Sequence, residues 1–140
     1  MRILWMLILS LGSLISLKAQ DDFAGMASYY ADKFVGRSTA SGETYQHHKY
    51  TCAHKTLPFG TKLRVTNPDN NVSVVVVVND RGPFVGTRVL DVSKSAAQKL
   101  GMIQKGIAYL EVEIITDEFL KNADEENTTE VIEIVLPSAF

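Results

Sequence analysis

Cysteine and histidine are scarce in this chain, and their scarcity limits which functions it can have. The 140 residues contain one cysteine, Cys52, which excludes an intramolecular disulfide and a cysteine-rich metal site. A lone cysteine between Thr51 and Ala53 is typical of a small buried hydrophobic residue. His47 and His48 are adjacent, so an extended backbone would point them to opposite faces and disfavour a shared metal site. We therefore expect no metal.

Nucleotide-binding and zinc-hydrolase motifs are absent as well. The sequence has no Walker loop, no glycine-rich dinucleotide fingerprint and no His-Glu-x-x-His helix, so we expect no cofactor. The net charge of -2 is unevenly distributed, with +4 over residues 25–116 and -6 over residues 117–140. A balance of this size is common for a solubilised surface, although a mildly basic core also suits an anionic ligand. Nothing here indicates a nucleic-acid partner.

The longest apolar run lies at the N-terminus. Arg2 precedes a mostly apolar stretch from Ile3 to Leu17, and Ala19 follows as a small residue. This order is typical of a cleavable signal peptide, so we predict a signal peptide at 1–19, a short linker at 20–24 and export to the periplasm, the cell envelope or the medium. The run is shorter than the roughly 20 residues that span a bilayer, so we expect no membrane span after cleavage, with an uncleaved anchor as the alternative. No cysteine follows it closely, which disfavours lipid anchoring.

Short β signals separated by turn residues follow. The residues from Val72 to Val78 are almost all valine, which predicts a strand buried on both faces. Because short strands must avoid open edges, the economical architecture is a small closed barrel. The chain is thus predicted to be mainly β, with strands over residues 25–30, 62–67, 72–78, 89–92 and 108–115.

One helix interrupts the β pattern. Ser93 can cap a helix over Lys94 to Leu100, and Gly101 is placed to end it. Asp91, just before the cap, is interpreted as a helix-start carboxylate rather than a catalyst. Residues 117–140 are acidic and are expected to form a flexible tail.

Carboxylates beside glycines are the remaining candidates for chemistry. Glu43 follows Ser41-Gly42, and Asp80 follows the valine strand. Cleavage of glycosidic bonds uses paired carboxyl groups, one to protonate the leaving oxygen and one to stabilise the oxocarbenium-like centre. Each residue also has a structural interpretation: Asp80 can close a turn with Arg81 as its ion-pair partner, Glu43 can be a loop acid, and His54 can be a core histidine. Spacing alone leaves both interpretations open.

A series of motifs runs in order over nearly all of residues 25–115. The motifs are Gly25-Met26-Ala27-Ser28-Tyr29-Tyr30, Gly36-Arg37-Ser38-Thr39-Ala40-Ser41-Gly42-Glu43, Thr51-Cys52-Ala53-His54-Lys55-Thr56-Leu57-Pro58-Phe59-Gly60-Thr61, Val65-Thr66-Asn67, Asn79-Asp80-Arg81-Gly82-Pro83-Phe84 and Asp91-Val92-Ser93. Together they closely resemble the family of rare lipoprotein A. The resemblance implies a six-stranded double-psi β-barrel with one short helix over residues 25–116. It also implies an endolytic lytic transglycosylase that cleaves peptidoglycan glycan strands and leaves 1,6-anhydro-N-acetylmuramic acid ends.

The resemblance also assigns the site. The family's functional acid after Ser-Gly corresponds to Glu43, its histidine after Thr-x-Ala to His54, and its aspartate before Arg-Gly-Pro-Phe to Asp80. We predict that Asp80 is the acid/base, that Glu43 is its partner and that His54 orients or polarises. The predicted substrate-binding residues are Arg81 at the lactyl carboxylate of muramic acid and, as apolar faces for sugar rings, Tyr29, Tyr30 and Phe84.

Two features depart from the resemblance. Many members carry a lipidated cysteine and a peptidoglycan-binding repeat, and neither is found in these 140 residues, so septal targeting is not predicted. Cys52 stands where alanine is expected. The main alternative function is a non-catalytic polysaccharide-binding module of the expansin-like or barwin-like type, and the formation of anhydro ends would distinguish the enzyme from the binder.

Overall fold

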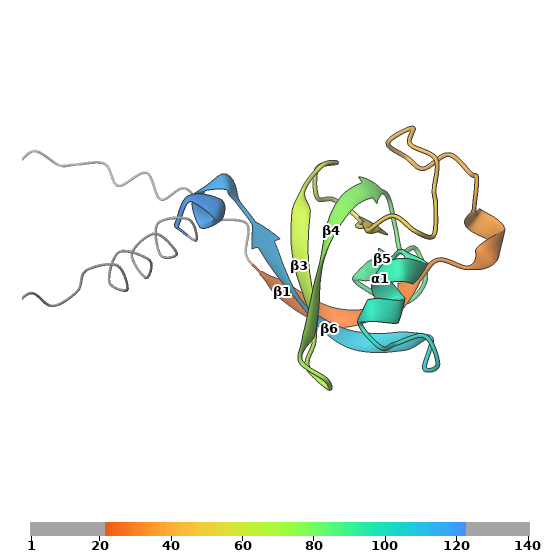
Figure 1. Cartoon of the computed structure of the whole chain (residues 1–140). Helices are drawn as coiled ribbons and strands as arrows, with labels where there is room; N and C mark the ends of the chain where they lie inside the picture. The colour runs from red at the N-terminus through yellow and green to blue at the C-terminus, as the bar shows by residue number, and fades with distance from the viewer. Residues whose placement is uncertain (1–21, 123–140) are drawn as a thin grey trace, which may run out of the picture.

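Six strands close into one barrel in the computed structural model, which describes residues 22–122 (Figure 1). The strands are adjacent in the order β1-β5-β2-β4-β3-β6, and β6 pairs back with β1. The β1–β5 and β2–β4 pairs are parallel, whereas the other four are antiparallel. The predicted closed barrel with one short α-helix is therefore confirmed. In chain order the elements are β1 (Phe23–Tyr29), the 3-10 turn η1 (Asp32–Phe34), β2 (Thr51–Ala53), β3 (Lys62–Asn67), β4 (Val72–Asp80), β5 (Leu90–Val92), α1 (Lys94–Lys99) and β6 (Ile107–Ile115).

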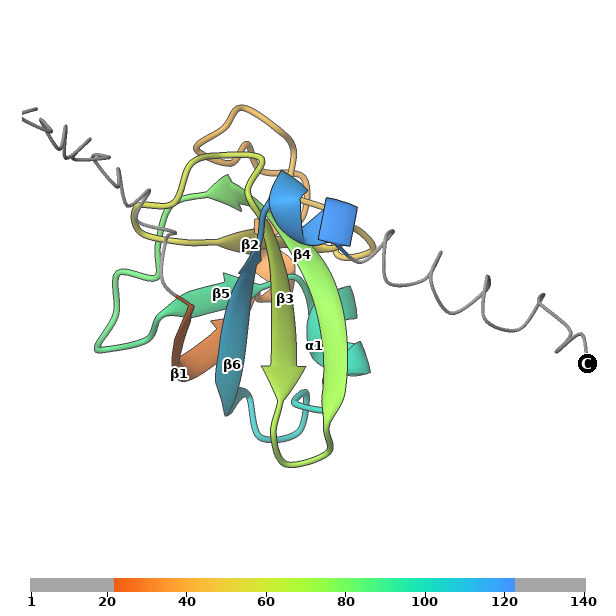
Figure 2. The same ribbon diagram turned by 90° about the vertical axis from the view of Figure 1, so that its left-hand side faces the viewer.

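The β3–β4 hairpin follows from the alternation in the sequence. Leu63 and Val65 point into the core and are fully buried. The turn between the strands places Asn71 at a φ of 60°, a left-handed conformation that asparagine tolerates. Buried Asn67 donates from Nδ2 to the Leu100 carbonyl at 2.7 Å, which attaches the hairpin to the end of α1. Figure 2 shows β6, β3 and β4 side by side, with α1 next to β4.

The valine-rich strand β4 is buried on one face, so the prediction of burial on both faces was wrong. Val76 and Val78 are fully buried, whereas Val75 is 43% exposed and Val72 is 37% exposed. The physical reason is that the barrel wall is a single sheet, whose outer face at Val75 is covered by no second layer. A run of valine therefore predicts a strand but does not indicate whether one or both of its faces are buried.

The helix begins at Lys94 as predicted and ends at Lys99, one residue before the predicted end at Leu100. The Ser93 hydroxyl accepts from the Ala96 N–H at 3.3 Å, and Gly101 follows the helix with a φ of 69°. Ala96 and Leu100 are fully buried. Asp91, in contrast, lies in β5, so the prediction of a helix-start carboxylate was wrong.

Cys52 lies in β2, where it is fully buried, as predicted, and burial raises the pKa of its thiol.

The barrel extends slightly beyond the motifs at both ends. β1 begins at Phe23, within the stretch predicted as linker. After β6, residues 117–122 are helical, and the Arg64 guanidinium lies 4.9 Å from the centre of the Phe119 ring. The predicted signal peptide at 1–19 and the predicted tail beyond 122 lie outside the described residues. Among residues 22–122, no helix is long and apolar enough to span a bilayer.

Candidate functional site

Asp80 is the last residue of β4, and its carboxylate is held from three sides. The backbone N–H groups of Ala40 and Arg81 each donate to Oδ1 at 2.8 Å. The Tyr30 hydroxyl donates to Oδ2 at 2.5 Å. The Asp80 carbonyl accepts from the His54 N–H at 3.1 Å. Donors from the residue that follows β1, from the loop after η1 and from the residue that follows β4 thus fix Asp80 at one end of the barrel.

Tyr30, which donates to Asp80, is itself held by other aromatic rings. Its ring stacks on Tyr45 with centroids 4.1 Å apart and planes 21° from parallel, and Phe34 packs edge-on at 5.7 Å. Burial, followed by the hydrogen bond to Asp80, raises the pKa of Tyr30. The hydroxyl therefore keeps its proton and remains available to the Asp80 carboxylate.

A groove of about 510 Å³ runs along this end of the barrel. Phe84 and Val85, which line it, are 83% and 66% exposed. An exposed phenylalanine beside carboxylates is typical of a site that binds sugar rings through their apolar faces. The groove brings together five residues that the sequence predicted for the site, namely Tyr29, Tyr30, Asp80, Arg81 and Phe84.

Asp91 is a second carboxylate in the groove, which the sequence interpretation missed. It lies in β5 directly opposite Ser28 of β1, whose hydroxyl donates to Asp91 Oδ1. The negative charges of Asp80 and Asp91 both contribute to raising the pKa of Tyr30. A carboxylate between two buried apolar residues, Leu90 and Val92, was the available signal, because alternation places it on the other face of the strand.

Glu43 belongs to the loop that contacts Asp80 but does not line the groove. Its loop is closed by a bridge between Ser38 and Thr44, and the loop reaches Asp80 through the Ala40 N–H. The Glu43 side chain is exposed, and within residues 22–122 its carboxylate has no hydrogen bond or ion pair. The structure therefore places Glu43 in the loop that contacts Asp80, with its carboxylate open to solvent.

His54 is not among the residues that line the groove either. Its Nδ1 accepts from the N–H groups of Thr56 and Leu57 at 3.1 and 2.9 Å, so in the neutral ring the proton is on Nε2. Burial lowers the pKa of His54, and the positive charges of Arg81 and Lys55 lower it further. A neutral imidazole that holds the following loop is the form this environment favours.

The guanidinium of Arg81 is occupied within the protein. Nη1 donates to the carbonyls of Leu57 at 2.8 Å and His54 at 3.4 Å. The guanidinium carbon lies 4.1 Å from the centre of the Phe59 ring. Arg81 lines the groove, but these contacts hold the loop after β2 and leave fewer of its donors for a ligand.

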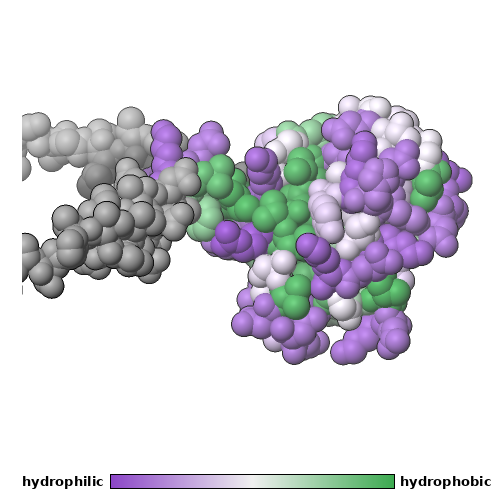
Figure 3. All heavy atoms as spheres, viewed as in Figure 1, coloured by the Kyte–Doolittle hydropathy of each residue, from purple (hydrophilic) through white to green (hydrophobic). Residues whose placement is uncertain are grey.

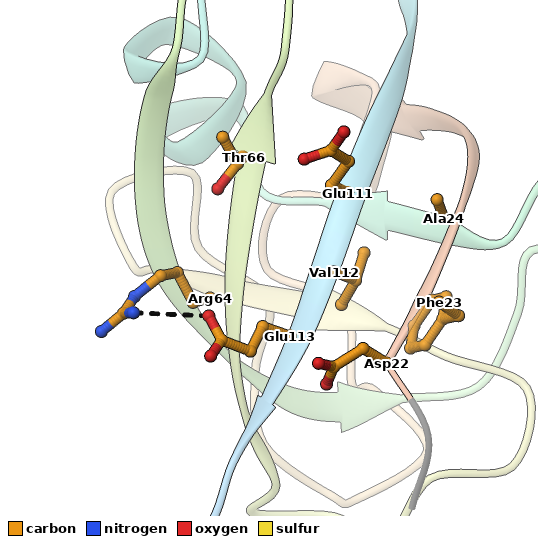
Figure 4. Close-up of a pocket in the computed structure, with 8 residues that line it drawn as sticks. All are labelled: Asp22, Phe23, Ala24, Arg64, Thr66, Glu111, Val112 and Glu113. Carbon is orange, nitrogen blue, oxygen red and sulfur yellow. Dashed lines mark hydrogen bonds and ion pairs between the residues drawn. The ribbon is translucent and has the colours of Figure 1, made fainter. Parts of the chain in front are cut away.

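A second hollow of about 440 Å³ lies on the outside of the barrel over β1, β3 and β6 (Figure 4). Arg64 pairs with Glu113 across it at 3.3 Å, and Asp22 Oδ1 accepts from the Ile114 N–H at 2.9 Å. None of the predicted site residues lines it. The cation of this hollow, Arg64, is already paired with Glu113, so we assign the candidate site to the groove instead.

The surface of the loops after η1 is mainly hydrophilic (Figure 3), which suits a ligand that carries many polar groups. In Figure 3, the loops that follow η1 present mainly hydrophilic residues, whereas hydrophobic residues gather around the end of β6. Across residues 22–122, no group of three or more His, Cys, Asp or Glu residues is arranged to hold a metal ion.

The family of the chain follows from comparison with known proteins. A family model described as lytic transglycolase matches residues 22–112, from the start of β1 into β6. The chain belongs to this family. Among its relatives, the endolytic peptidoglycan transglycosylase RlpA of Neisseria meningitidis serogroup A is 54% identical over 91 residues, which are 65% of this chain and 38% of that protein. The protein of the same name from Pseudomonas aeruginosa strain UCBPP-PA14 is 55% identical over 89 residues, or 64% of this chain and 26% of that protein.

Solved structures of other proteins share the fold of this barrel. The Streptomyces papain inhibitor superposes with a TM-score of 0.55 and 21% identity, over 69% of this chain and 96% of that one. An expansin of Clavibacter michiganensis gives a TM-score of 0.56 and 23% identity, over 69% of this chain and 52% of that one. At this identity the likeness concerns the fold, and it confirms the predicted double-psi β-barrel.

Proposed function

We propose that this chain is an endolytic lytic transglycosylase of peptidoglycan. It cleaves the bond between N-acetylmuramic acid and N-acetylglucosamine and leaves a 1,6-anhydro-N-acetylmuramic acid end. The family description and the names of its relatives support this reaction class. The single observation that carries the proposal is the Asp80 carboxylate, held by three hydrogen bonds in a groove that also contains Asp91 and exposed Phe84.

The reaction needs two proton transfers and no water. The C1–O bond to N-acetylglucosamine breaks as the 6-hydroxyl of the same muramic acid attacks C1. One proton goes to the departing oxygen, and one leaves the 6-hydroxyl. A single carboxyl group can perform both steps, first as acid and then as base, and we assign this role to Asp80.

The contact of Asp80 with Tyr30 suits both states of this exchange. A tyrosine hydroxyl can donate to a carboxylate and can accept from a carboxylic acid. Tyr30 can therefore remain hydrogen-bonded to Oδ2 whether or not Asp80 carries the proton. The two backbone N–H donors hold Oδ1, so the carboxyl group keeps its orientation through the cycle.

Three other groups are proposed to assist. Asp91, in the same groove, supplies negative charge for the oxocarbenium-like centre at C1. Glu43, in the loop that contacts Asp80, is the proposed partner that enters the site from the solvent side. His54 is an auxiliary that positions Arg81 through its carbonyl and the following loop through Nδ1.

The product decides between this proposal and its alternative. Purified protein is incubated with intact sacculi and with peptide-free glycan strands, and the ends formed are analysed by mass spectrometry. The proposal expects anhydro ends, which lack one water relative to the reducing ends that a hydrolase would leave. Binding to glycan without any new ends would instead support a polysaccharide-binding module.

We also propose that the chain is exported to the cell envelope after loss of residues 1–19. The support is the sequence pattern of Arg2, the apolar run and Ala19. N-terminal sequencing of the protein recovered from the envelope tests this. A mature chain that still begins at Met1 would contradict it.

A further inference from the structure

A third hollow, of about 570 Å³, adjoins the groove, and we call it the side cleft. Five residues line both the groove and the side cleft, namely Ser28, Tyr29, Tyr30, Ala31 and Arg88. The end of β1 therefore forms a shared wall, and a ligand lying in the groove has room to place a substituent in the side cleft.

The side cleft is lined by more positive than negative charge. Arg88, Lys94 and Lys105 line it, with Asp32 as its single acid. Lys94 Nζ contacts Asp32 Oδ1 at 2.9 Å. Lys105 lies 3.7 Å from Asp69, but both side chains are about three-quarters exposed, so water screens this pair. The cleft thus retains positive charge that the protein does not neutralise.

Arg88 is the cation best suited to a ligand. It is partly buried and lies between the groove and the side cleft, and within residues 22–122 it has neither a hydrogen-bond acceptor nor an ion-pair partner. Arg81, by contrast, already donates to two carbonyls. The donors of Arg88 are therefore available to a ligand, and the planar arrangement of these donors matches a carboxylate.

We propose that the side cleft is a carboxylate-binding subsite, with Arg88 as the residue that binds the carboxylate and Lys94 as a secondary charge. This rests on the proposed function, because the anion must belong to the glycan that occupies the groove. Peptidoglycan offers two sources of carboxylate. The lactyl group of muramic acid is ionised when its peptide has been removed, and the stem peptide has carboxylates of its own.

The test measures binding and cleavage separately on three substrates: peptide-free strands, the same strands with their lactyl carboxylates converted to amides, and peptide-bearing sacculi. The variants are Arg88→Gln and Lys94→Gln. Lys49→Gln, which removes an exposed cation that lines neither the groove nor the side cleft, is the matched control. Melting curves establish that each variant is folded.

For Arg88→Gln we expect the Kd for peptide-free strands to rise about tenfold, as the loss of one charge-assisted interaction implies. Lys94→Gln should have a smaller effect, and Lys49→Gln should have none. Amidated strands should bind the wild type about tenfold more weakly and should show no further loss with Arg88→Gln. If only the sacculi show dependence on Arg88, the carboxylate is that of the stem peptide.

Equal binding of native and amidated strands by the wild type, together with sacculus binding that is unaffected by Arg88→Gln, would overturn the subsite. The comparison of native with amidated strands uses the wild type alone, and melting curves show whether Arg88→Gln is folded for the measurement on sacculi. Failure of the proposed function is a different result: the wild type would form no anhydro ends on any substrate, while the dependence of binding on Arg88 could persist.

Discussion

Arg81 follows Asp80 directly in the chain, yet its guanidinium carbon lies 4.1 Å from the centre of the Phe59 ring and its Nη1 donates to carbonyls of the loop after β2. The only group of Arg81 that donates to the Asp80 carboxylate is its backbone N–H. The adjacent opposite charges are thus turned apart. The sequence left open an ion pair between them, and the structure uses the two side chains for separate tasks.

Because Arg81 fastens the loop that contains His54 and Leu57, Arg81→Ala should lower stability. Loss of its hydrogen bonds and of the contact with Phe59 should cost about 1–3 kcal/mol. For a domain of this size, each 1 kcal/mol corresponds to a shift of roughly 4–8 °C in Tm. Thermal unfolding of Arg81→Ala and of the control Lys49→Ala measures this. An unchanged Tm for Arg81→Ala would mean that the loop is held by other contacts.

His54 should make stability depend on pH. Its pKa is lowered in the folded state by burial, by Arg81 and by Lys55, whereas the unfolded chain binds a proton near the ordinary value of about 6.5. The contribution of neutral His54 is therefore fully present above about pH 6.5 and is lost as the pH falls from there toward the folded-state pKa. Between about pH 7 and about pH 5, we expect the Tm of the wild type to fall more steeply than that of His54→Gln, which cannot titrate there. Parallel slopes would contradict this account.

Local signals predicted β3 and α1, whereas non-local pairing shaped much of the site. The alternation in β3 and the cap at Ser93 lie within a few residues of the elements they define. β2 is three residues long, too short for periodicity to indicate it. Local alternation could show that Asp91 points away from the core, but its pairing with Ser28 joins positions 63 residues apart, so the groove that it lines could not be predicted from a local pattern. The resemblance to a family directed attention to Asp80, Glu43 and His54, and contacts between distant segments then determined which of them line the groove.

The segment after β6 should contribute little to stability, and Phe119 should account for that contribution. Its ring lies beneath the Arg64 guanidinium at 4.9 Å, and its N–H donates to Thr116 Oγ1 at 3.3 Å. A chain that ends at Asn122 should melt like the full-length protein, because residues 123–130 are mostly acidic or polar and separate the apolar stretch at 131–136 from the barrel. A chain that ends at Thr116 should lose about 0.5–1 kcal/mol, and Phe119→Ala should lose the same amount. A large drop on removing 123–140 alone would mean that this segment contributes to the fold.

Asp80→Asn should abolish most of the activity while the barrel stays folded. Asparagine retains an oxygen for the N–H groups of Ala40 and Arg81, and its amide can donate to the Tyr30 oxygen, because the tyrosine hydroxyl can rotate. What is lost is proton transfer, a function worth ~10²–10⁴ in rate. The rate of formation of anhydro ends, the melting curve and the glycan affinity are measured for each variant. We expect a normal melting curve and nearly normal glycan binding for Asp80→Asn.

The same assay ranks the other candidates against Asp80. Glu43→Gln should be similarly damaging if the exposed carboxylate of Glu43 enters the site when glycan binds, and His54→Ala should be milder because His54 acts through the loop it holds. Asp91→Asn keeps an acceptor for the Ser28 hydroxyl but removes negative charge from the groove, so it should reduce the rate more than the affinity. If Glu43→Gln retains full activity while Asp91→Asn loses it, the working pair of carboxylates is Asp80 with Asp91. Full activity in a folded Asp80→Asn protein would refute the mechanism, because an amide can neither protonate the departing oxygen nor take the proton from the 6-hydroxyl.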